Sequence, residues 1–265
     1  MGCAPRHRNL AETDPIDHQR YSAIAHGELI YWNPIDPERL GAWLGQLPLG
    51  PGSRALDVGC GRGALLLDIA ARHGCQGVGV DSHPAAIEHA RAASARQPDS
   101  AAIEWICGPF DVAAQAPASF DLVACLGAGH ACGGFAQALE TLTPLLIPGG
   151  QLLVGEGFWA REPDPGYLAF LGAGPDDLLT HEGNRQLAEQ GGLVCRRSHA
   201  ASPAEWSHYE DTYAANVVAH VAAHPDDPEA ATMTERIDAW RDAYLRWGRQ
   251  TLGFGLYLFE KPSGS

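Results

Sequence analysis

Short apolar runs alternate with segments of helical periodicity through the first part of the chain. The apolar runs cover residues 54–59, 77–81, 102–107, 120–126 and 150–156. The segments with helical spacing cover residues 64–73, 84–96 and 135–146. Short strands that alternate with helices are typical of right-handed βαβ units, in which helices cover both faces of a parallel sheet. The pattern therefore predicts an α/β fold with a doubly wound, mostly parallel, Rossmann-like sheet.

The later part of the chain completes this sheet. Residues 181–190 have the spacing of a further helix. Residues 193–199 and 254–260 have the length of two more strands, and the second of these runs is strongly apolar. With the five earlier runs they predict a sheet of seven strands.

Two other segments do not follow the alternation of strand and helix. Residues 157–180 are rich in proline, glycine and aromatic side chains and are too long for a simple connection. Residues 203–252 have the spacing of two longer helices. We predict that both are cap insertions, at about 157–180 and 203–252, in a main domain that covers residues 51–265. Residues 1–50 are predicted to form an N-terminal helical cap segment.

Composition and charge exclude several classes of protein. The 265 residues are 45% hydrophobic and 19% charged, which suffices for a folded core. Lysine and arginine number 18 against 32 aspartates and glutamates, so the formal net charge is −14. Such a surface repels a phosphate backbone. No apolar run approaches the ~20 residues of a membrane-spanning helix. We therefore predict neither a nucleic-acid partner nor a membrane partner.

The cysteines and histidines bear on location and on metals. Seven cysteines form an odd, scattered set without a CxxC pair, which favours reduced thiols in the cytoplasm and argues against zinc. His220 and His224 could share a metal, but they precede Pro-Asp-Asp and are typical of a solvated helix end. Residues 1–20 lack the apolar stretch of a secretory signal. We expect a cytoplasmic protein with no metal site.

A glycine-rich turn follows the first predicted strand. Residues 56–63 read Leu-Asp-Val-Gly-Cys-Gly-Arg-Gly. Glycines at this point let the backbone approach a ligand over the carboxyl edge of the sheet. Asp81 ends the next strand, 20 residues after Gly61, and a carboxylate there accepts hydrogen bonds from a ribose diol. The ligand is therefore predicted to be an adenosine derivative.

Two kinds of adenosine ligand fit these glycines. Gly59-x-Gly61-x-x-Ala64 also matches the dinucleotide fingerprint, which leaves NAD open at this point. Asp57 favours the other kind, because an anion beside the turn repels a pyrophosphate and attracts an amino group or a sulfonium. The alternative role for Asp57 is to order the loop by accepting hydrogen bonds from backbone amides.

The motifs together resemble one family. Gly-Val-Asp81-Ser82 follows the turn, Phe110-Asp111 follows the third strand, and Phe120-Asp-Leu-Val begins the fourth. Over residues 50–156 this series resembles the class I S-adenosylmethionine-dependent methyltransferases. The resemblance implies the family's sheet, which ends in an antiparallel hairpin, here residues 193–199 with 254–260.

The resemblance also implies S-adenosylmethionine as the cofactor. In the family the glycine turn cradles the methionine part, the acid after the second strand holds the ribose hydroxyls, and the acid after the third strand meets the adenine amino group. The matching cofactor-binding positions here are Asp57, Gly59, Cys60, Gly61, Asp81, Ser82, Phe110, Asp111, Leu126 and Gly127. One departure from the family pattern is Pro109, which interrupts the usual short turn before Asp111.

Two residues are candidates for catalysis. Methyl transfer is an in-line displacement, and a protein base is needed only when the acceptor must lose a proton. His130 follows the fourth strand and could accept that proton, since a histidine titrates near neutral pH. Glu156 ends the fifth strand at the same edge and could orient an amine or a hydroxyl. The alternative for each is a purely structural role in its loop.

Aromatic side chains are the candidates for binding the methyl acceptor. Three segments, at residues 126–135, 155–159 and 205–210, resemble a subgroup of the family that acts on small molecules. Within them and in the N-terminal segment, the predicted substrate-binding residues are Tyr21, His26, Trp32, Trp159, Trp206 and Tyr209. The last two lie on one helical stripe, and such a stripe is more often core than pocket. Ordinary packing therefore stays open for all six.

The sequence as a whole predicts an enzyme that moves a methyl group from S-adenosylmethionine to a small molecule at nitrogen, oxygen, sulfur or carbon. Two alternatives are an NAD-dependent oxidoreductase and a non-catalytic S-adenosylmethionine-binding subunit. Methylation of nucleic acid is disfavoured by the charge, and the Asn/Asp-Pro-Pro-aromatic box is absent after the fourth strand. A homodimer is kept as a possible assembly.

Overall fold

The computed structural model describes residues 16–27, 29–97 and 103–264. Residues 1–15 of the predicted segment 1–50 lie outside the described residues, as does residue 102 of the third predicted strand. The chain forms two compact units. The sheet unit consists of Ile35–Glu156, Glu182–His199 and Gly255–Ser265. The helical unit consists of Met1–Pro34, Gly157–His181 and Ala200–Phe254. The division into a 1–50 segment and a 51–265 domain stays a prediction.

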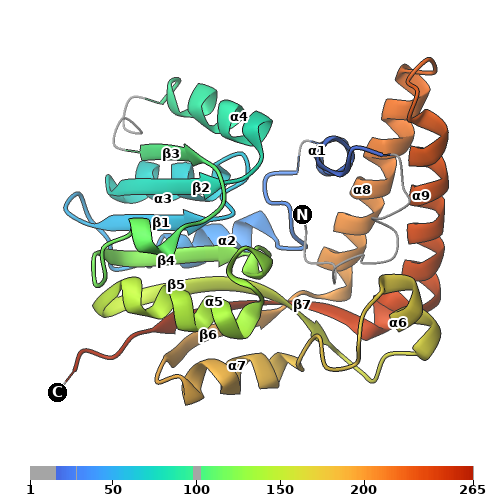
Figure 1. Ribbon diagram of the computed structural model, residues 1–265. Coiled ribbons are helices and arrows are strands. Elements are labelled where there is room, and N and C mark those ends of the chain that lie inside the picture. Colours follow the sequence, from blue (N-terminus) through green and yellow to red (C-terminus); the bar gives the residue numbers. More distant parts are fainter. Residues whose placement is uncertain (1–15, 28, 98–102, 265) are drawn as a thin grey trace. The chain divides into compact units, whose positions relative to one another are not determined.

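A seven-stranded sheet has the strand order β3-β2-β1-β4-β5-β7-β6 (Figure 1). Its strands are β1 (Arg54–Val58), β2 (Gln76–Asp81), β3 (Ile103–Cys107), β4 (Phe120–Leu126), β5 (Leu146–Trp159), β6 (Val194–Ala200) and β7 (Leu252–Glu260). The pairs from β3 through β5 are parallel. The predicted α/β class with a doubly wound, mostly parallel sheet is confirmed.

The last strand runs against its neighbours. Gly149 N donates to Lys261 O at 2.8 Å and Lys261 N donates to Gly150 O at 2.9 Å, which joins the start of β5 to the end of β7. Ala201 N donates to Phe254 O at 2.8 Å, which joins the end of β6 to the start of β7. The start of one strand thus meets the end of another, so β7 is antiparallel. The predicted hairpin at this end of the sheet is present.

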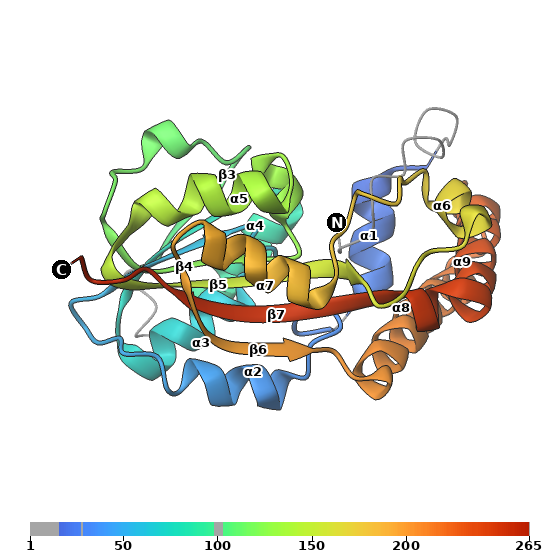
Figure 2. The ribbon, with the colours of Figure 1, turned by 90° about the horizontal axis from the view of Figure 1, so that it is seen from below.

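Helices cover both faces of the sheet in the sheet unit (Figure 2). The longer ones are α2 (Pro37–Leu44), α3 (Ala64–His73), α4 (Pro84–Ser94), α5 (Phe135–Leu142) and α7 (His181–Gln190). Short 3-10 turns are η2 (Val112–Ala114), η3 (Gly129–Cys132) and η4 (Thr143–Leu145). Figure 2 shows α2 and α3 on one face and α5 and α7 on the other.

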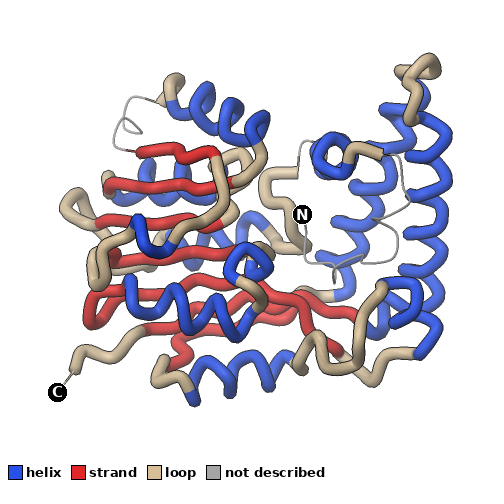
Figure 3. The backbone as a smooth tube through the Cα atoms, in the orientation of Figure 1, coloured by secondary structure: helices blue, strands red, loops and turns tan. Residues whose placement is uncertain are grey.

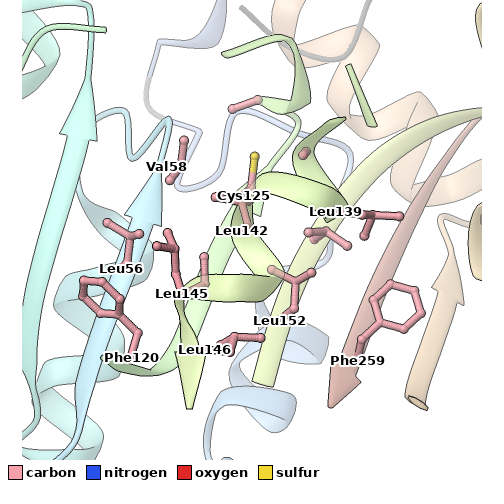
Figure 4. Close-up of a cluster of buried hydrophobic side chains, with 14 of the residues drawn as sticks. Leu56, Val58, Phe120, Cys125, Leu139, Leu142, Leu145, Leu146, Leu152 and Phe259 are labelled. Atoms are coloured by element: carbon pink, nitrogen blue, oxygen red, sulfur yellow. The ribbon is translucent and has the colours of Figure 1, made fainter. Parts of the chain in front are cut away.

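The core of the sheet unit lies between the sheet and α5 with α7. Strands β1, β4, β5 and β7 contribute Leu56, Cys125, Leu152 and Phe259, none more than 2% exposed. Figure 4 shows these side chains gathered with leucines of α5 and η4. At about 25 cal/mol per Å² of apolar surface removed from water, such burial is the main source of stability. The continuous apolar runs of the sequence form this core.

The helical unit is made mostly of helices joined by loops, and its described strand residues are the terminal parts of β5, β6 and β7 (Figure 3). It contains α1 (His18–His26), α6 (Pro165–Leu171), α8 (Pro203–Ala223), α9 (Ala230–Ala243), a π-helical turn η5 (Tyr244–Gly248) and α10 (Arg249–Thr251). Ser202 and Glu205 form a capping box that begins α8. Tyr21, Val217 and Met233 pack in a core formed by α1, α8 and α9.

A polar network also joins α1 to the turn between α8 and α9. The Arg20 guanidinium pairs with Asp227 and with Glu229. The hydrogen bond from Arg20, with a second from His220, lowers the pKa of the Asp227 carboxyl. His220 Nε2 lies 3.0 Å from Asp227 Oδ2, so the histidine belongs to this network.

In the part of the chain that the structure describes, no group of three or more His, Cys, Asp or Glu side chains could hold a metal. None of the described helices is long and apolar enough to cross a membrane.

The buried Glu210 in α8 gives a prediction on stability. Its carboxylate is 5% exposed and accepts a hydrogen bond from Trp240 Nε1 at 2.7 Å. Burial raises the pKa of Glu210 to about 7. The folded chain therefore binds this proton more tightly than the unfolded chain, so stability is lost as the pH rises through 7. We expect Glu210→Gln, which keeps the acceptor for Trp240, to unfold at a higher temperature than the parent chain near about pH 8.5 and to match it near about pH 5.

Thermal unfolding at the two pH values checks this expectation. The matched control is Glu140→Gln, because Glu140 is exposed on α5 of the sheet unit. An equal pH dependence in the parent chain and in Glu210→Gln would contradict the assignment of the proton to Glu210.

Candidate functional site

The loop after β1 is fixed by backbone hydrogen bonds to the end of β2. Gly59 N and Cys60 N both donate to Val80 O, at 2.8 and 3.1 Å. Gly63 N donates to Cys60 O at 2.9 Å, which closes the loop just before α3 begins. The loop therefore lies at the carboxyl edge of the two parallel strands, where open α/β sheets bind ligands.

The Asp81 carboxylate ties the glycine turn to the next helix. Its Oδ2 accepts a hydrogen bond from Gly61 N and its Oδ1 accepts one from His83 N, both at 2.8 Å. His83 is the residue that precedes α4. A carboxylate oxygen has two lone pairs, so each oxygen keeps capacity to accept from a ligand hydroxyl. Asp81 thus holds the loop in a shape that also presents an acid at the strand end.

Two glycines of the loop face different surroundings. A Cβ atom on Gly59 would lie 2.2 Å from Ala128 Cβ, so this glycine lets the β1 loop pack against the β4 loop. A Cβ atom on Gly61 would meet nothing within 4 Å. Gly61 has φ +51°, a conformation that favours glycine. The loop therefore touches protein on one side and open space at Gly61.

Asp57 is the buried acid beneath this loop. It lies on β1 and is 3% exposed. Burial, and to a smaller extent the charge of Asp81, raise the pKa of Asp57 to about 7. A positively charged group beside this buried acid would stabilise its charged form and lower its pKa. The electrostatics of the site therefore suit a cationic ligand group.

Other cofactor candidates differ in what they can offer. The Cys60 side chain points toward Gly79, and burial raises the pKa of its thiol. The part of Cys60 that can face a ligand is therefore its backbone. Ser82 is exposed beside Asp81. Gly127 N donates to Gly155 O at 2.9 Å, which fixes the loop after β4, and Leu126 before it is half-buried. These residues surround the same edge of the sheet unit.

The segment after β3 holds the two adenine candidates. Phe110 is half-buried and packs against the core of the sheet unit. Asp111 is exposed, and its Oδ1 accepts a hydrogen bond from Ala113 N at 2.9 Å, which caps η2. Despite Pro109, the chain therefore places an ordered acid after β3, and its contact with adenine stays a prediction.

The two catalytic candidates lie at the ends of β4 and β5. Glu156 is 9% exposed, and a Cβ atom on Gly129 of η3 would lie 2.7 Å from its Oε2. His130, the next residue of η3, is exposed. The structure thus places Glu156 under the turn that carries His130. Their catalytic roles stay predictions.

Three substrate-binding candidates meet around His26 in the helical unit. His26 is 1% exposed, and its Nδ1 donates to Ser22 O at 2.7 Å. Its Nε2 therefore accepts from Tyr209 Oη at 2.9 Å. The Trp32 ring stacks on the imidazole with centroids 4.6 Å apart and planes 10° apart. The structure brings these three side chains together across α1 and α8.

The other three candidates are also buried in the helical unit. Trp159 is 5% exposed and its Nε1 donates to Pro175 O at 2.9 Å. Tyr21 is 3% exposed, and the Arg236 guanidinium lies 5.2 Å from the centre of its ring. Trp206 is 7% exposed. The stripe on α8 is thus partly core, and binding of an acceptor by these residues stays a prediction.

Sequence reasoning did not single out two residues that shape the site. His83 donates its backbone amide to Asp81, and the pattern Asp-x-His-Pro before a helix could have suggested that cap. Trp105 lies beneath the glycine loop. Its signal is the glycine at position 79 inside a strand, because such glycines mark close approach of another group.

Comparisons with known proteins agree with this geometry. A family model described as a methyltransferase domain matches residues 56–152. YjhP of Escherichia coli (strain K12) is 30% identical over 246 residues, which cover 91% of this chain and 98% of YjhP. Its crystal structure has a TM-score of 0.78 to this chain. A SAM-dependent methyltransferase from Geobacter sulfurreducens, crystallised with S-adenosyl-L-homocysteine, is 26% identical with a TM-score of 0.82, over 91% of this chain and 97% of that one.

A named enzyme is similar over a shorter region. The ubiquinone biosynthesis O-methyltransferase of Albidiferax ferrireducens is 33% identical over 168 residues. These residues are 60% of this chain and 64% of that enzyme. The chain belongs to the class I S-adenosylmethionine-dependent methyltransferases. The predicted enzyme class and cofactor are thereby confirmed, and the NAD alternative is set aside.

Proposed function

We propose that the sheet unit binds S-adenosylmethionine over Gly61 and that the enzyme transfers its methyl group to a small-molecule acceptor. The observation that carries the proposal is the open space at Gly61 beside an anchored acid. The residues present fit the cofactor, because its ribose needs an acceptor pair and its cationic groups need an anion. Asp81 and Asp57 meet these two needs.

The remaining cofactor residues are assigned by their place at the same edge. Ser82 would support the ribose, Phe110 and Asp111 the adenine, and Leu126 with Gly127 the methionine part. The sulfonium of the cofactor supplies an already activated methyl carbon. The protein's own task is to align the acceptor with that carbon and to exclude water.

The acceptor is proposed to bind through aromatic side chains of the helical unit. His26, Trp32 and Tyr209 combine ring faces with polar atoms, as small-molecule sites do. His130 would accept a proton from an acceptor that must lose one, and Glu156 would orient the acceptor. The net charge of −14 supports a small metabolite over nucleic acid.

The cellular location and the assembly are part of the proposal. An odd set of cysteines without framework spacing supports a cytoplasmic location. A homodimer is the assembly that we would test first, by sedimentation of the full chain.

The proposed reaction is tested by S-adenosylhomocysteine release. The full chain is incubated with S-adenosylmethionine and a panel of amines, phenols, alcohols and thiols, and the product is measured by mass. Acceptor-dependent release with a mass increase of one methyl group is expected. Nucleic acid as the only effective acceptor would contradict the small-molecule assignment.

The pH dependence of cofactor binding tests the role of Asp57. Because the pKa of Asp57 is raised to about 7, a bound cation should ionise it and release a proton near neutral pH. We expect the affinity for S-adenosylmethionine to rise with pH through 7, and Asp57→Asn to remove most of that rise. Calorimetry in two buffers of different ionisation enthalpy measures the released proton. Equal proton release by the parent chain and the variant would contradict this role.

A further inference from the structure

A buried tryptophan lies directly beneath the glycine loop. Trp105 is on β3, where it is paired with Gly79 of β2, and it is 7% exposed. A Cβ atom on Gly79 would lie 2.5 Å from both Cε3 and Cζ3 of the indole. Glycine at this position therefore lets the ring cross over β2.

The same ring reaches the end of the loop. A Cβ atom on Gly63 would lie 2.5 Å from Trp105 Cη2 and 2.9 Å from Cζ3. The third close neighbour of that position is Ala90 of α4, at 2.9 Å from its Cβ. The Cys60 thiol also borders this space, 3.1 Å from the Cβ position of Gly79. The outer ring of the indole thus fills the volume between β2 and the loop that ends at Gly63.

The indole nitrogen, Nε1, does not explain why position 105 is a tryptophan. Within residues 16–27, 29–97 and 103–264, Trp105 Nε1 has no hydrogen-bond partner although it is buried. A buried donor without a partner costs free energy that a phenylalanine would not. A phenylalanine side chain is shorter, and it would lack the far edge of the indole that includes Cη2, the atom closest to the Cβ position of Gly63. The shape of the side chain, and not its hydrogen bonding, is therefore the feature that the loop uses.

We infer that Trp105 is a positioning residue for S-adenosylmethionine, because its indole supports the loop that places Gly61 against Asp81. This inference rests on the proposed function, since it assumes that the cofactor lies over this loop. Gly61 N must stay 2.8 Å from Asp81 Oδ2 for the acid and the open space to remain side by side. A misplacement of about 1 Å at such a site can lower binding or rate by a large factor.

The inference is tested by the affinity of the full chain for S-adenosylhomocysteine in Trp105→Phe and Trp105→Leu. Affinity is measured by calorimetry at a temperature at which circular dichroism shows that each variant is folded. We expect binding to weaken about threefold in Trp105→Phe and about tenfold or more in Trp105→Leu, because each step removes more of the support. The phenylalanine variant keeps the test valid if the leucine variant folds poorly. The matched control is Trp247→Phe, because Trp247 is a half-buried tryptophan of the helical unit that stacks on Tyr167.

A second variant separates support of the loop from general packing. Trp105→Leu/Gly79→Ala returns apolar volume next to β2 but places nothing beneath Gly63. We expect the double variant to bind S-adenosylhomocysteine as weakly as Trp105→Leu, whatever its melting temperature. Affinities of both Trp105 variants within twofold of the parent would overturn the inference, as would affinities that simply follow the melting temperatures. No binding by the parent chain would instead overturn the proposed function and, with it, the inference.

Discussion

Asp81→Ala is expected to weaken binding of S-adenosylhomocysteine by at least about a hundredfold. Hydrogen bonds to a charged group contribute roughly 1.5–3 kcal/mol each, and a factor of ten in affinity is about 1.4 kcal/mol. The variant removes the acceptor proposed for the ribose hydroxyls. It also releases Gly61 N and His83 N, which now donate to this carboxylate. Calorimetry on the full chain measures the loss.

Asp121→Ala is the matched control for this substitution. Asp121 is also a half-buried strand acid, and its Oδ2 accepts a hydrogen bond from Arg54 N at 2.8 Å. That bond lies where β1 and β4 begin, away from the carboxyl edge. We expect Asp121→Ala to lower the melting temperature and to leave the affinity within about twofold of the parent, because the substitution is remote from the carboxyl edge. Equal affinities in both variants would remove Asp81 from the site.

Gly61→Asn is expected to abolish measurable binding of S-adenosylhomocysteine. Asparagine tolerates the left-handed conformation that Gly61 adopts at φ +51° better than other side chains do. The loop should therefore keep its shape while the new side chain occupies the open space. Since that space is proposed to hold the cofactor, the loss should come from exclusion and not from unfolding. Equilibrium binding and thermal unfolding are measured on the same sample.

Gly192→Asn controls for the cost of the backbone conformation. Gly192 has φ +87°, and a Cβ atom there would also meet nothing within 4 Å. It precedes β6 and is far in sequence from the loop. We expect the two asparagine variants to lose similar stability and only Gly61→Asn to lose binding. Retained affinity in Gly61→Asn would show that the ligand does not lie over this glycine.

The fold could be predicted from sequence because each sheet strand is a short apolar run between turn residues. The runs at 54–59 and 77–81 are β1 and β2 almost to the residue. The prediction failed where tertiary packing extends an element. β5 begins at Leu146, which pairs with Phe120 of β4, and continues to Trp159, beyond the predicted run 150–156. Backbone hydrogen bonds of Lys261 and Thr251 with residues near the two ends of β5 join it to the segment of β7.

The last long helix differed for a related reason. The second of the two helices predicted within residues 203–252 is interrupted, because α9 ends at Ala243 and a π-helical turn follows at Tyr244–Gly248. A Cβ atom on Gly248 would lie 2.8 Å from Tyr167 Oη. The close approach of Tyr167 is a contact with a distant segment, which helical periodicity does not report.

The site could likewise be predicted where the signal is local in sequence, and could not where it depends on contacts between distant segments. The glycine turn and Asp81 are local signals with a known spacing, so their place at one sheet edge could be foreseen. The hydrogen bond between His26 and Tyr209 joins residues 183 positions apart, and no local pattern encodes it. The support of the loop by Trp105 likewise depends on how β3 lies beside β2.

The most direct test of the account is a crystal structure of the full chain grown with S-adenosylhomocysteine. The account predicts both ribose hydroxyls within hydrogen-bonding distance of the Asp81 carboxylate and the methionine part over Gly61. Electron density for the ligand at another edge of the sheet, with Asp81 bonded only to Gly61 N and His83 N, would contradict it.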